Sequence, residues 1–231
     1  MSRIALVIGA HPDDPEFGVG GTVALWVRQG WKFHYLIVTD GSKGTSDPSQ
    51  DGPSLVQQRQ QEQRAAAAEL GVAEVRFLGF HDGEVEASQL LLSHLVGELR
   101  RLRPQAVFTH NPEALEFRKP GGRAYVAHRD HRAVGHSVLD AVYPAARDPH
   151  YFPEHRESGL QPHKVGHVYL WGSGSADLRV DIRETFPLKL QAIQKHTSQI
   201  PADHPRLLRA QQRWQQGRPF YEYFRHLRID L

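Results

Sequence analysis

A run of apolar residues near the start of the chain, Ile4-Ala5-Leu6-Val7-Ile8, shows no alternation with polar residues. A strand with one face in water alternates, so this run predicts a strand over Arg3–Ile8 that is buried on both faces, as in a parallel sheet covered by helices. Three ionisable side chains, His11, Asp13 and Asp14, follow it directly. Charge at the end of a buried strand costs free energy unless a cation or a reaction uses it.

The rest of the chain alternates between strand-like and helix-like segments. Two helices are well marked, because Leu55–Leu70 ends before Gly71 and Ser88–Arg103 ends before Pro104. Strand and helix in alternation predict βαβ units, right-handed crossovers and a parallel sheet. The expected strands are 3–8, 33–39, 75–78, 106–109, 168–171 and 178–182, and the expected helices are 18–27 (entered through a loop), 55–70, 88–103 and 130–142.

The length of 231 residues suits one large domain, and neither a repeat nor a clear domain boundary interrupts it. We therefore expect a single domain over residues 1–231. Residues 147–167 are rich in Pro, His and charge, which predicts an irregular lid or an oligomer contact. From about Phe186 onward the chain is expected to be mainly helical, with breaks at prolines.

Composition limits the classes of function. A net charge of +2 without a Lys/Arg run gives no case for a nucleic-acid partner. No apolar stretch approaches the roughly 20 residues that span a bilayer, and a signal-peptide pattern is lacking, so a cytoplasmic protein is expected. The chain has no cysteine and 15 histidines. Any metal must therefore be held by nitrogen and oxygen ligands.

Polar residues follow each of the first four expected strands. In parallel sheets, functional groups collect at the carboxyl ends of the strands, so these segments are expected to share one rim. In chain order they are His11–Asp14, Asp40-Gly41-Ser42, His81-Asp82-Gly83 and His110-Asn111, and the cluster His128-Arg129-Asp130-His131 ends the loop after the last of them.

These clusters predict a metal site made by two distant loops. His11 and Asp14 lie three residues apart in a loop restricted by Pro12, while His128 and His131 share a face if they lie in the first turn of a helix. Two His and one Asp make an open zinc site that keeps a position for water. The plainer interpretation is that the aspartates are turn or helix-cap residues and that the His pair lies on a solvated face.

The run Gly18-Val19-Gly20-Gly21 raises the alternative of a dinucleotide-binding loop. The Gly-x-Gly-x-x-Gly fingerprint begins immediately after the first strand, whereas the His-Asp motif occupies that turn here. We interpret these glycines as a tight entry into the helix and do not expect an NAD-dependent enzyme.

At these motifs the chain resembles the PIG-L/LmbE-like family of zinc-dependent N-acetylglucosamine de-N-acetylases. The family's first signature corresponds to His11-Pro12-Asp13-Asp14, and its second, His-x-Asp-His, corresponds to His128–His131. Weaker matches occur in the expected order along most of the chain, at Thr39-Asp40-Gly41, Arg59-Gln60-Gln61-Glu62, Lys189 and His196-Thr197-Ser198-Gln199.

The resemblance implies a Rossmann-like α/β fold, mostly parallel with helices on both faces. It implies the following roles: His11, Asp14 and His131 as zinc ligands, Asp13 as general base, His128 as oxyanion or proton donor, Asp130 as the residue that orients His128, and Arg59 as a substrate-binding residue. It also implies a homo-oligomer, either a trimer or a hexamer.

The chain departs from the family at two positions. Arg129 stands where the family often has Pro, and Val126 stands where some members carry a Tyr near the oxyanion. The expected function is metal-dependent removal of the N-acetyl group from an N-acetylglucosamine-type sugar or conjugate, with a small amino sugar as the substrate. Fe²⁺ or another divalent ion could replace Zn²⁺ on such ligands. The alternatives are a hydrolase of another amide or ester and, further off, a carbohydrate-binding protein without turnover.

Overall fold

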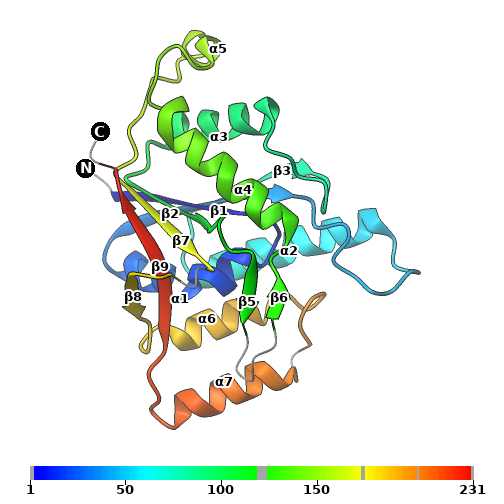
Figure 1. The fold of residues 1–231 in the computed structure, drawn as a ribbon. Helices are drawn as coiled ribbons and strands as arrows, with labels where there is room; N and C mark the ends of the chain where they lie inside the picture. The colour runs from blue at the N-terminus through cyan, green and yellow to red at the C-terminus, as the bar shows by residue number, and fades with distance from the viewer. Residues whose placement is uncertain (1–2, 119–123, 173–174, 202, 230–231) are drawn as a thin grey trace.

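A computed structural model of the chain describes residues 3–118, 124–172, 175–201 and 203–229. A seven-stranded sheet in the order β3-β2-β1-β4-β7-β9-β8 runs through the molecule (Figure 1). The strands β3, β2, β1, β4 and β7 are parallel, and β9 pairs antiparallel with both β7 and β8. Their bounds are β1 Arg3–Gly9, β2 Trp31–Thr39, β3 Glu74–Phe80, β4 Ala106–His110, β7 His167–Trp171, β8 Leu178–Asp181 and β9 Tyr221–Arg228.

Helices cover both faces of this sheet, as Figure 1 shows. Alternate residues of β1 divide between two cores: Leu6 and Ile8 pack with α3 and α4, while Ala5 and Val7 pack with α1, α2 and α6. The buried first strand and the mostly parallel, single-domain α/β fold predicted from the sequence are thereby confirmed. The helices are α1 Asp14–Arg28, α2 Gly52–Glu69, α3 Gln89–Leu102, α4 Arg129–Asp140 and α6 Phe186–Ile193.

The well-marked helices form for local reasons. Ser88 caps α3 by accepting a hydrogen bond from the Leu91 backbone N–H, and Arg103 ends the helix in a left-handed conformation. Leu91, Leu95 and Leu99 recur every fourth residue and are fully buried. This spacing places one apolar face of α3 on the sheet.

The start of α1 was predicted four residues too late. The helix begins at Asp14, so the His-Asp motif forms the turn that leads into it and the glycines lie inside it. A Cβ at Gly18 would lie 2.8 Å from the Trp171 ring, and one at Gly21 would lie 2.6 Å from Ile182. These glycines therefore permit close packing of α1 against β7 and the segment after β8, and are not a helix entry.

The prediction of a mainly helical end to the chain was wrong for its last part. After α6 and α7 (Pro205–Gln215), the chain forms β9, which inserts between β7 and β8. Its register pairs Phe224 with Trp171 and Arg225 with Leu170. Buried Glu222 and Phe224 alternate with the exposed Tyr223, which is the two-residue period of a strand. The charged residues of this segment obscure that period in the sequence.

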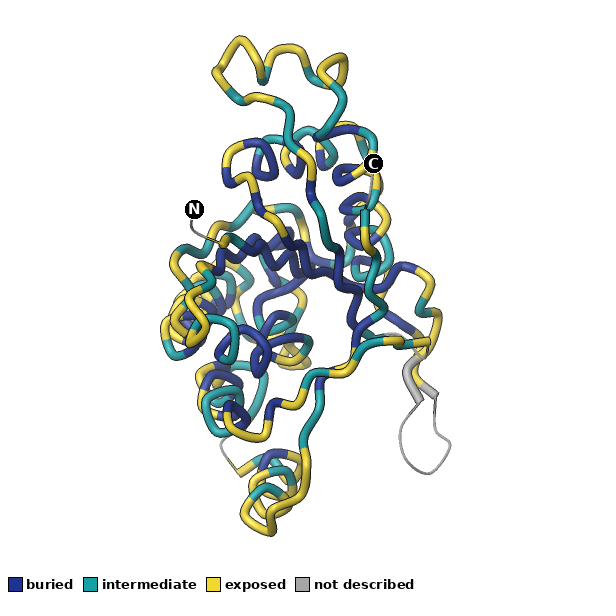
Figure 2. Tube along the Cα trace, turned by 90° about the vertical axis from the view of Figure 1, so that its left-hand side faces the viewer, coloured by how far each residue is buried: buried dark blue, intermediate teal, exposed yellow. Residues whose placement is uncertain are grey.

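Four short elements lie outside the main layers. β5 (Glu116–Arg118) and β6 (Ala124–Val126) form an antiparallel pair. The π-helical turn η1 (Ala141–Ala145) continues α4, and α5 (Pro153–Glu157) lies in the segment predicted to be irregular. This segment projects from the body of the molecule and is largely exposed (Figure 2). Its role as a lid or oligomer contact stays a prediction.

A buried arginine of α3 anchors the base of this projecting segment. The Arg100 guanidinium donates to the backbone carbonyls of Ala145, Ala146, Asp148, Tyr151 and Phe152 at 2.9–3.3 Å. Burial lowers the pKa of Arg100. The carbonyls thus take the place of a carboxylate partner.

We expect Arg100→Ala to lower the free energy of unfolding by about 3 kcal/mol, because several buried carbonyls lose a charged donor. The matched control is Arg101→Ala, since Arg101 is more exposed and pairs with Glu98 and Glu74. That change should cost under about 1 kcal/mol. Urea unfolding midpoints measure both, and equal losses would contradict the role given to Arg100.

Candidate metal centre

Four of the five segments that the sequence placed at one rim meet at the carboxyl ends of the parallel strands. The turn after β1 carries His11, the first residue of α1 is Asp14, and the loop after β3 carries Asp82. His110 ends β4, while His128 caps α4 and is followed by Asp130 and His131 in its first turn. The ligand atoms fall into three overlapping groups that could hold a metal: His11/His128/His131, Asp14/His110/His131 and His11/Asp82/Asp130.

The three predicted zinc ligands form a triangle in which the two His nitrogens face different oxygens of the Asp14 carboxylate. His11 Nδ1 lies 3.2 Å from His131 Nε2 and 3.5 Å from Asp14 Oδ2, and His131 Nε2 lies 3.3 Å from Asp14 Oδ1. Ligands about 2.1 Å from a tetrahedral zinc are separated by about 3.4 Å, so these atoms have the spacing that such an ion requires. The residues present fit a bound divalent metal.

The far side of the His11 ring is held by two carboxylates. His11 Nε2 lies 3.2 Å from Asp82 Oδ1 and 3.3 Å from Asp130 Oδ2. A proton on Nε2 leaves the Nδ1 lone pair free for a metal, the usual arrangement of a metal-binding histidine. Asp82 was placed at this rim by the sequence, but its contact with His11 was missed.

Asp130 was expected to orient His128, and the structure gives its carboxylate another position. The carboxylate lies beside His11 and accepts hydrogen bonds from the backbone N–H groups of Gly83 (2.7 Å) and Val85 (3.3 Å). The link to His128 runs instead through the Asp130 backbone N–H, which donates to His128 Nδ1 (3.2 Å). In the neutral His128 ring, the proton is therefore on Nε2.

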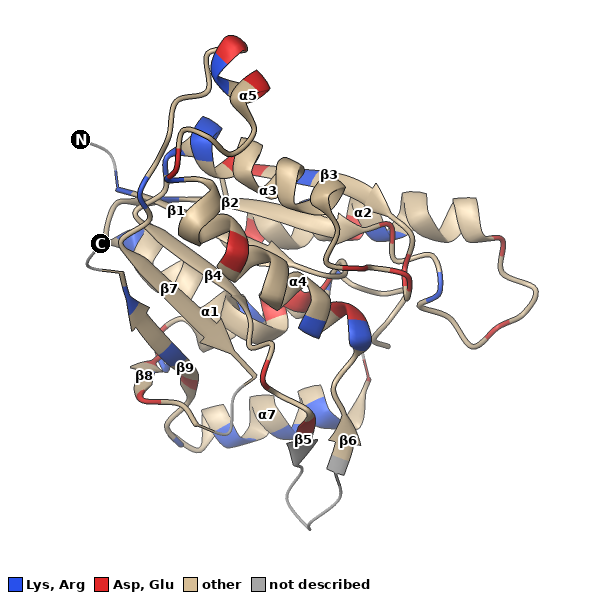
Figure 3. Ribbon diagram, turned by 45° about the horizontal axis from the view of Figure 1, so that its top comes forward, with Lys and Arg blue, Asp and Glu red and all other residues tan. Residues whose placement is uncertain are grey.

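Acidic residues gather where α4 begins (Figure 3). Burial alone would lower the pKa of His11, but the carboxylates of Asp130, Asp14 and Asp82 raise it to about 12. Burial would raise the pKa of Asp14, but His131 and His110 hold it well below its usual range. The centre therefore has a strong preference for positive charge, which a divalent cation satisfies.

His110 is a member of this cluster that the predicted site left out. Its Nε2 lies 3.1 Å from Asp14 Oδ2, and its ring stacks on that of His131 with centroids 4.0 Å apart. Burial lowers the pKa of His110 to about 4, which keeps the ring neutral. The available signal was its position at the carboxyl end of β4, comparable to that of His11 just beyond β1.

Asp13, the predicted general base, has an unusual backbone conformation. Its φ is 106°, in the left-handed region that non-glycine residues rarely adopt. Burial and the neighbouring Asp14 raise its pKa to about 7, with Arg59 acting in the opposite sense. Backbone strain held at a site with a shifted pKa is a mark of a functional position.

Arg59, the predicted substrate-binding residue, lies beneath the motif turn and is only 3% exposed. Its guanidinium donates to the carbonyls of Pro12 (2.6 Å) and Gly41 (2.8 Å), and lies 3.4 Å from Asp13 Oδ2. These contacts make it a positioning residue for the turn and for Asp13. A direct contact with substrate does not fit this buried position.

We expect Arg59→Lys to lower kcat about tenfold with metal retained, because an ammonium cannot replace the hydrogen bonds of the planar guanidinium fork. Arg64→Lys is the matched control, since Arg64 is an exposed arginine of the same helix. Steady-state kinetics and metal content measure both. An unchanged kcat with a raised KM would instead return Arg59 to a substrate-binding role.

Residues of the C-terminal part of the chain contact α1 and α2, the helices next to the motif turn of residues 11–14. His196 lies 3.0 Å from the buried carboxylate of Glu16, and Ser198 donates to Glu62 at 2.6 Å. Lys189 donates to the Phe17 carbonyl at 2.8 Å. The weakly matching residues Lys189 and His196–Gln199 therefore lie close to α1 and α2, which carry the motifs.

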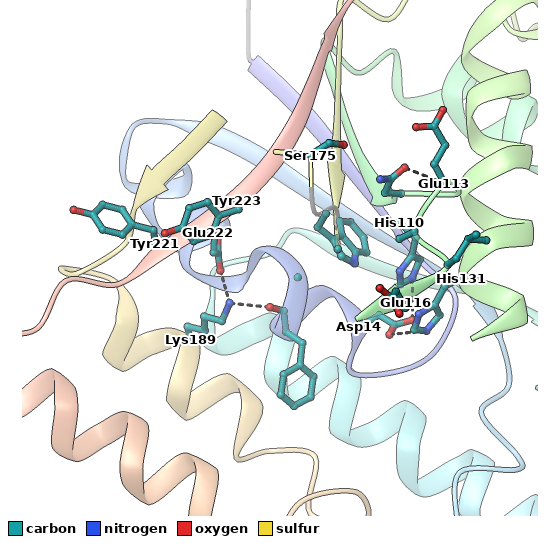
Figure 4. Close-up of a pocket in the computed structure, with 17 residues that line it drawn as sticks. Asp14, His110, Glu113, Glu116, His131, Ser175, Lys189, Tyr221, Glu222 and Tyr223 are labelled. Carbon is teal, nitrogen blue, oxygen red and sulfur yellow. Dashed lines mark hydrogen bonds and ion pairs between the residues drawn. The ribbon is translucent and has the colours of Figure 1, made fainter. Parts of the chain in front are cut away.

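A cavity of about 940 Å³ opens beside the metal centre. Asp14, His110 and His131 lie at one end and Tyr221, Glu222 and Tyr223 of β9 at the other (Figure 4). This volume lies in the upper range of small-molecule sites. A ligand that fills the cavity would have one end at the His/Asp cluster.

The sheet and the His/Asp cluster together define an α/β metalloenzyme scaffold. The model of the family PIG-L, described as GlcNAc-PI de-N-acetylase, matches residues 6–142, and the chain belongs to this family. The family predicted from the sequence is thus confirmed. In the described part of the chain, helices with the length and apolarity of a membrane span are absent.

Several relatives are named as deacetylases. The diacetylchitobiose deacetylase of Thermococcus kodakarensis is 32% identical over 86% of this chain and 70% of its own length. A probable N-acetyl-alpha-D-glucosaminyl L-malate deacetylase 2 of Bacillus anthracis is 26% identical over 96% of this chain and 95% of its own. The solved N,N'-diacetylchitobiose deacetylase of Pyrococcus horikoshii has a TM-score of 0.85 at 29% identity, covering 98% and 84% of the two chains. These relatives confirm the predicted enzyme class, an N-deacetylase.

Proposed function

We propose that this protein removes the acetyl group from an N-acetylglucosamine-type sugar by metal-dependent hydrolysis, releasing acetate and a free amine. The triangle of His11 Nδ1, His131 Nε2 and the Asp14 carboxylate, with edges of 3.2–3.5 Å, carries this proposal. Three protein ligands leave a coordination position for water or substrate, as catalytic zinc sites do. Zn²⁺ is the proposed ion, and Fe²⁺ is the alternative for the same ligands.

The residues around the triangle supply the rest of the reaction. A bound zinc ion would polarise the acetamide carbonyl and lower the pKa of water towards about 7. Asp13, with its pKa near 7, is proposed to accept the proton of the attacking water. His128 is proposed to donate from Nε2 to the developing oxyanion, because its Nδ1 already accepts the Asp130 N–H. Asp82 and Asp130 keep His11 in the tautomer that presents Nδ1.

The test is acetate release from N-acetylglucosamine derivatives by the chelator-treated protein and by the same protein reloaded with Zn²⁺ or Fe²⁺. We expect release only after reloading, and the more active ion identifies the metal. Release that survives complete metal removal would overturn the metal dependence.

Two alternatives are separated by the same assay. A hydrolase of another amide or ester would bind metal but release no acetate from any N-acetyl sugar. A carbohydrate-binding protein would bind the sugar without turnover, although binding alone does not require the strained Asp13. A homo-oligomeric state and a cytoplasmic location stay predictions.

A further inference from the structure

The peptide group that joins Pro12 to Asp13 is held at both of its polar atoms by side chains of α2. The Pro12 carbonyl accepts a hydrogen bond from the Arg59 guanidinium at 2.6 Å. The Asp13 backbone N–H donates to Gln63 Oε1 at 2.8 Å. Residues 59 and 63 lie one turn apart, so their side chains share a face of the helix. We call these two hydrogen bonds the peptide clamp.

The peptide clamp acts on the backbone angle that makes Asp13 unusual. Rotation of the peptide group before Asp13 changes the φ of this residue. The φ of 106° lies in a region that a non-glycine residue keeps only where its surroundings hold it there. Without the clamp, rotation to a negative φ would relieve the strain and move the Asp13 carboxylate relative to the ligand triangle.

The side-chain amide of Gln63 is itself fixed in direction. An amide accepts through its oxygen and donates through its NH₂ group, so only one of its two orientations suits the Asp13 N–H. Gln63 Nε2 donates to the Glu16 carboxylate, with distances of 3.0 and 3.1 Å to the two oxygens. This contact turns the amide oxygen towards Asp13. Gln63 and Glu16 are fully buried, so water does not compete for these groups.

Glu16 is held in turn by the C-terminal part of the chain. Nε2 of His196, which is also fully buried, lies 3.0 Å from Glu16 Oε2. Burial raises the pKa of Glu16, while the contacts with His196 and Gln63 act in the opposite sense. In either protonation state, a carboxyl group keeps an oxygen that can accept from Gln63. A continuous set of buried contacts therefore runs from His196 to the backbone of Asp13.

We propose that Gln63 is a positioning residue for the proposed base, because it holds the Asp13 backbone in its left-handed conformation. Glu16 and His196 set the direction of the Gln63 amide. The inference rests on the proposed deacetylation and adds to it the residues that place the proton acceptor. The described hydrogen bonds of Gln63 go to Asp13 and Glu16 and not to the three proposed metal ligands. Loss of the Gln63 amide should therefore lower turnover and spare zinc binding.

The first experiment uses Gln63→Met, because methionine has a similar length but lacks the donor and the strong acceptor of the amide. In zinc-saturated protein, kcat for acetate release should fall about 10- to 100-fold, since misplacing a reacting group by about 1 Å can cost that much. KM and zinc affinity should stay near those of the wild type. Gln61→Met is the matched control, because Gln61 is an exposed glutamine of the same helix, and it should change none of these quantities. An unchanged kcat in Gln63→Met, or a zinc affinity that falls together with kcat, would overturn the proposal.

A second variant separates positioning from packing. Gln63→Glu keeps an oxygen that can accept from the Asp13 N–H, so it should retain a higher kcat than Gln63→Met. Its free energy of unfolding should nevertheless be the lower of the two, because two carboxyl groups then meet in a buried site. If methionine were the better residue for turnover as well as for stability, Gln63 would have a packing role only.

The third experiment combines Gln63→Met with Asp13→Asn. If Gln63 acts only through the Asp13 carboxylate, the double variant should release acetate in a single turnover at the rate of Asp13→Asn alone. A general disturbance of the fold would lower the rate in both backgrounds. A further fall as large as the one that Gln63→Met causes in the wild type would therefore overturn the proposal.

Hydrogen exchange tests the peptide clamp even if the wild type releases no acetate, the result that would remove the proposed function. In the zinc-loaded protein, NMR should show the Asp13 amide proton exchanging about tenfold faster in Gln63→Met than in the wild type, because its acceptor is lost. Gln61→Met should exchange at the wild-type rate. Equal exchange in all three proteins would count against the clamp.

Discussion

Asp14→Ala is expected to empty the metal centre. Asp14 completes the ligand triangle with His11 and His131. Its carboxylate also supplies negative charge that offsets the charge of a bound cation. A residue that only supports a ligand typically contributes 10–100-fold to metal affinity, so loss of a direct ligand should cost more than about 100-fold. Deacetylation should fall to background, because the metal and its water are lost together.

The measurement is zinc affinity by competition with a chelating dye, together with metal content after dialysis. Asp82→Asn is the graded control, since Asp82 touches only the Nε2 side of His11 among the three proposed ligands. It should lose about 10–100-fold in affinity and regain activity in excess zinc. An Asp14→Ala protein that binds zinc as tightly as the wild type would remove Asp14 from the ligand set.

The fold could be predicted wherever local signals agreed with the tertiary structure. The apolar run of β1, the capped helix α3 and the glycine after α2 each determine structure through a few neighbouring residues. The prediction was wrong where a distant partner decides. The glycines of α1 favour a break in isolation, but they are helical because Trp171 and Ile182 pack against them. β9 becomes a strand because β7 and β8 offer it two edges.

The same distinction between local and distant signals holds for the residues of the site. His11, Asp14, His128 and His131 could be found because their spacing within one turn carries the pattern. His110 and Asp82 are single residues at strand ends, and only the strand order brings them to the centre. The contacts of Arg59 and Asp130 could not be predicted, because the direction of a side chain depends on packing: Arg59 points beneath the motif turn and Asp130 points to His11.

Asp13→Asn is expected to lower kcat by about 10²–10⁴-fold while zinc affinity stays near that of the wild type, because it removes the proposed proton acceptor and leaves the ligand triangle intact. Asparagine is the informative substitution at this position. It is nearly isosteric with aspartate, and it tolerates the left-handed region that the φ of 106° requires, whereas alanine would add backbone strain. The backbone N–H of residue 13 can still donate to Gln63, as it does at 2.8 Å in the wild type.

Single-turnover acetate release with zinc-saturated protein measures this prediction, and the dye competition used for Asp14 supplies the metal readout. The variants at the two adjacent aspartates serve as controls for one another. The change at position 14 should remove metal, and the change at position 13 should remove turnover alone. Loss of zinc from Asp13→Asn would exchange the two assignments. Full turnover in Asp13→Asn would move the proton acceptor to another residue at the rim. Asp82, whose Oδ1 lies 3.2 Å from His11 Nε2, is the next candidate.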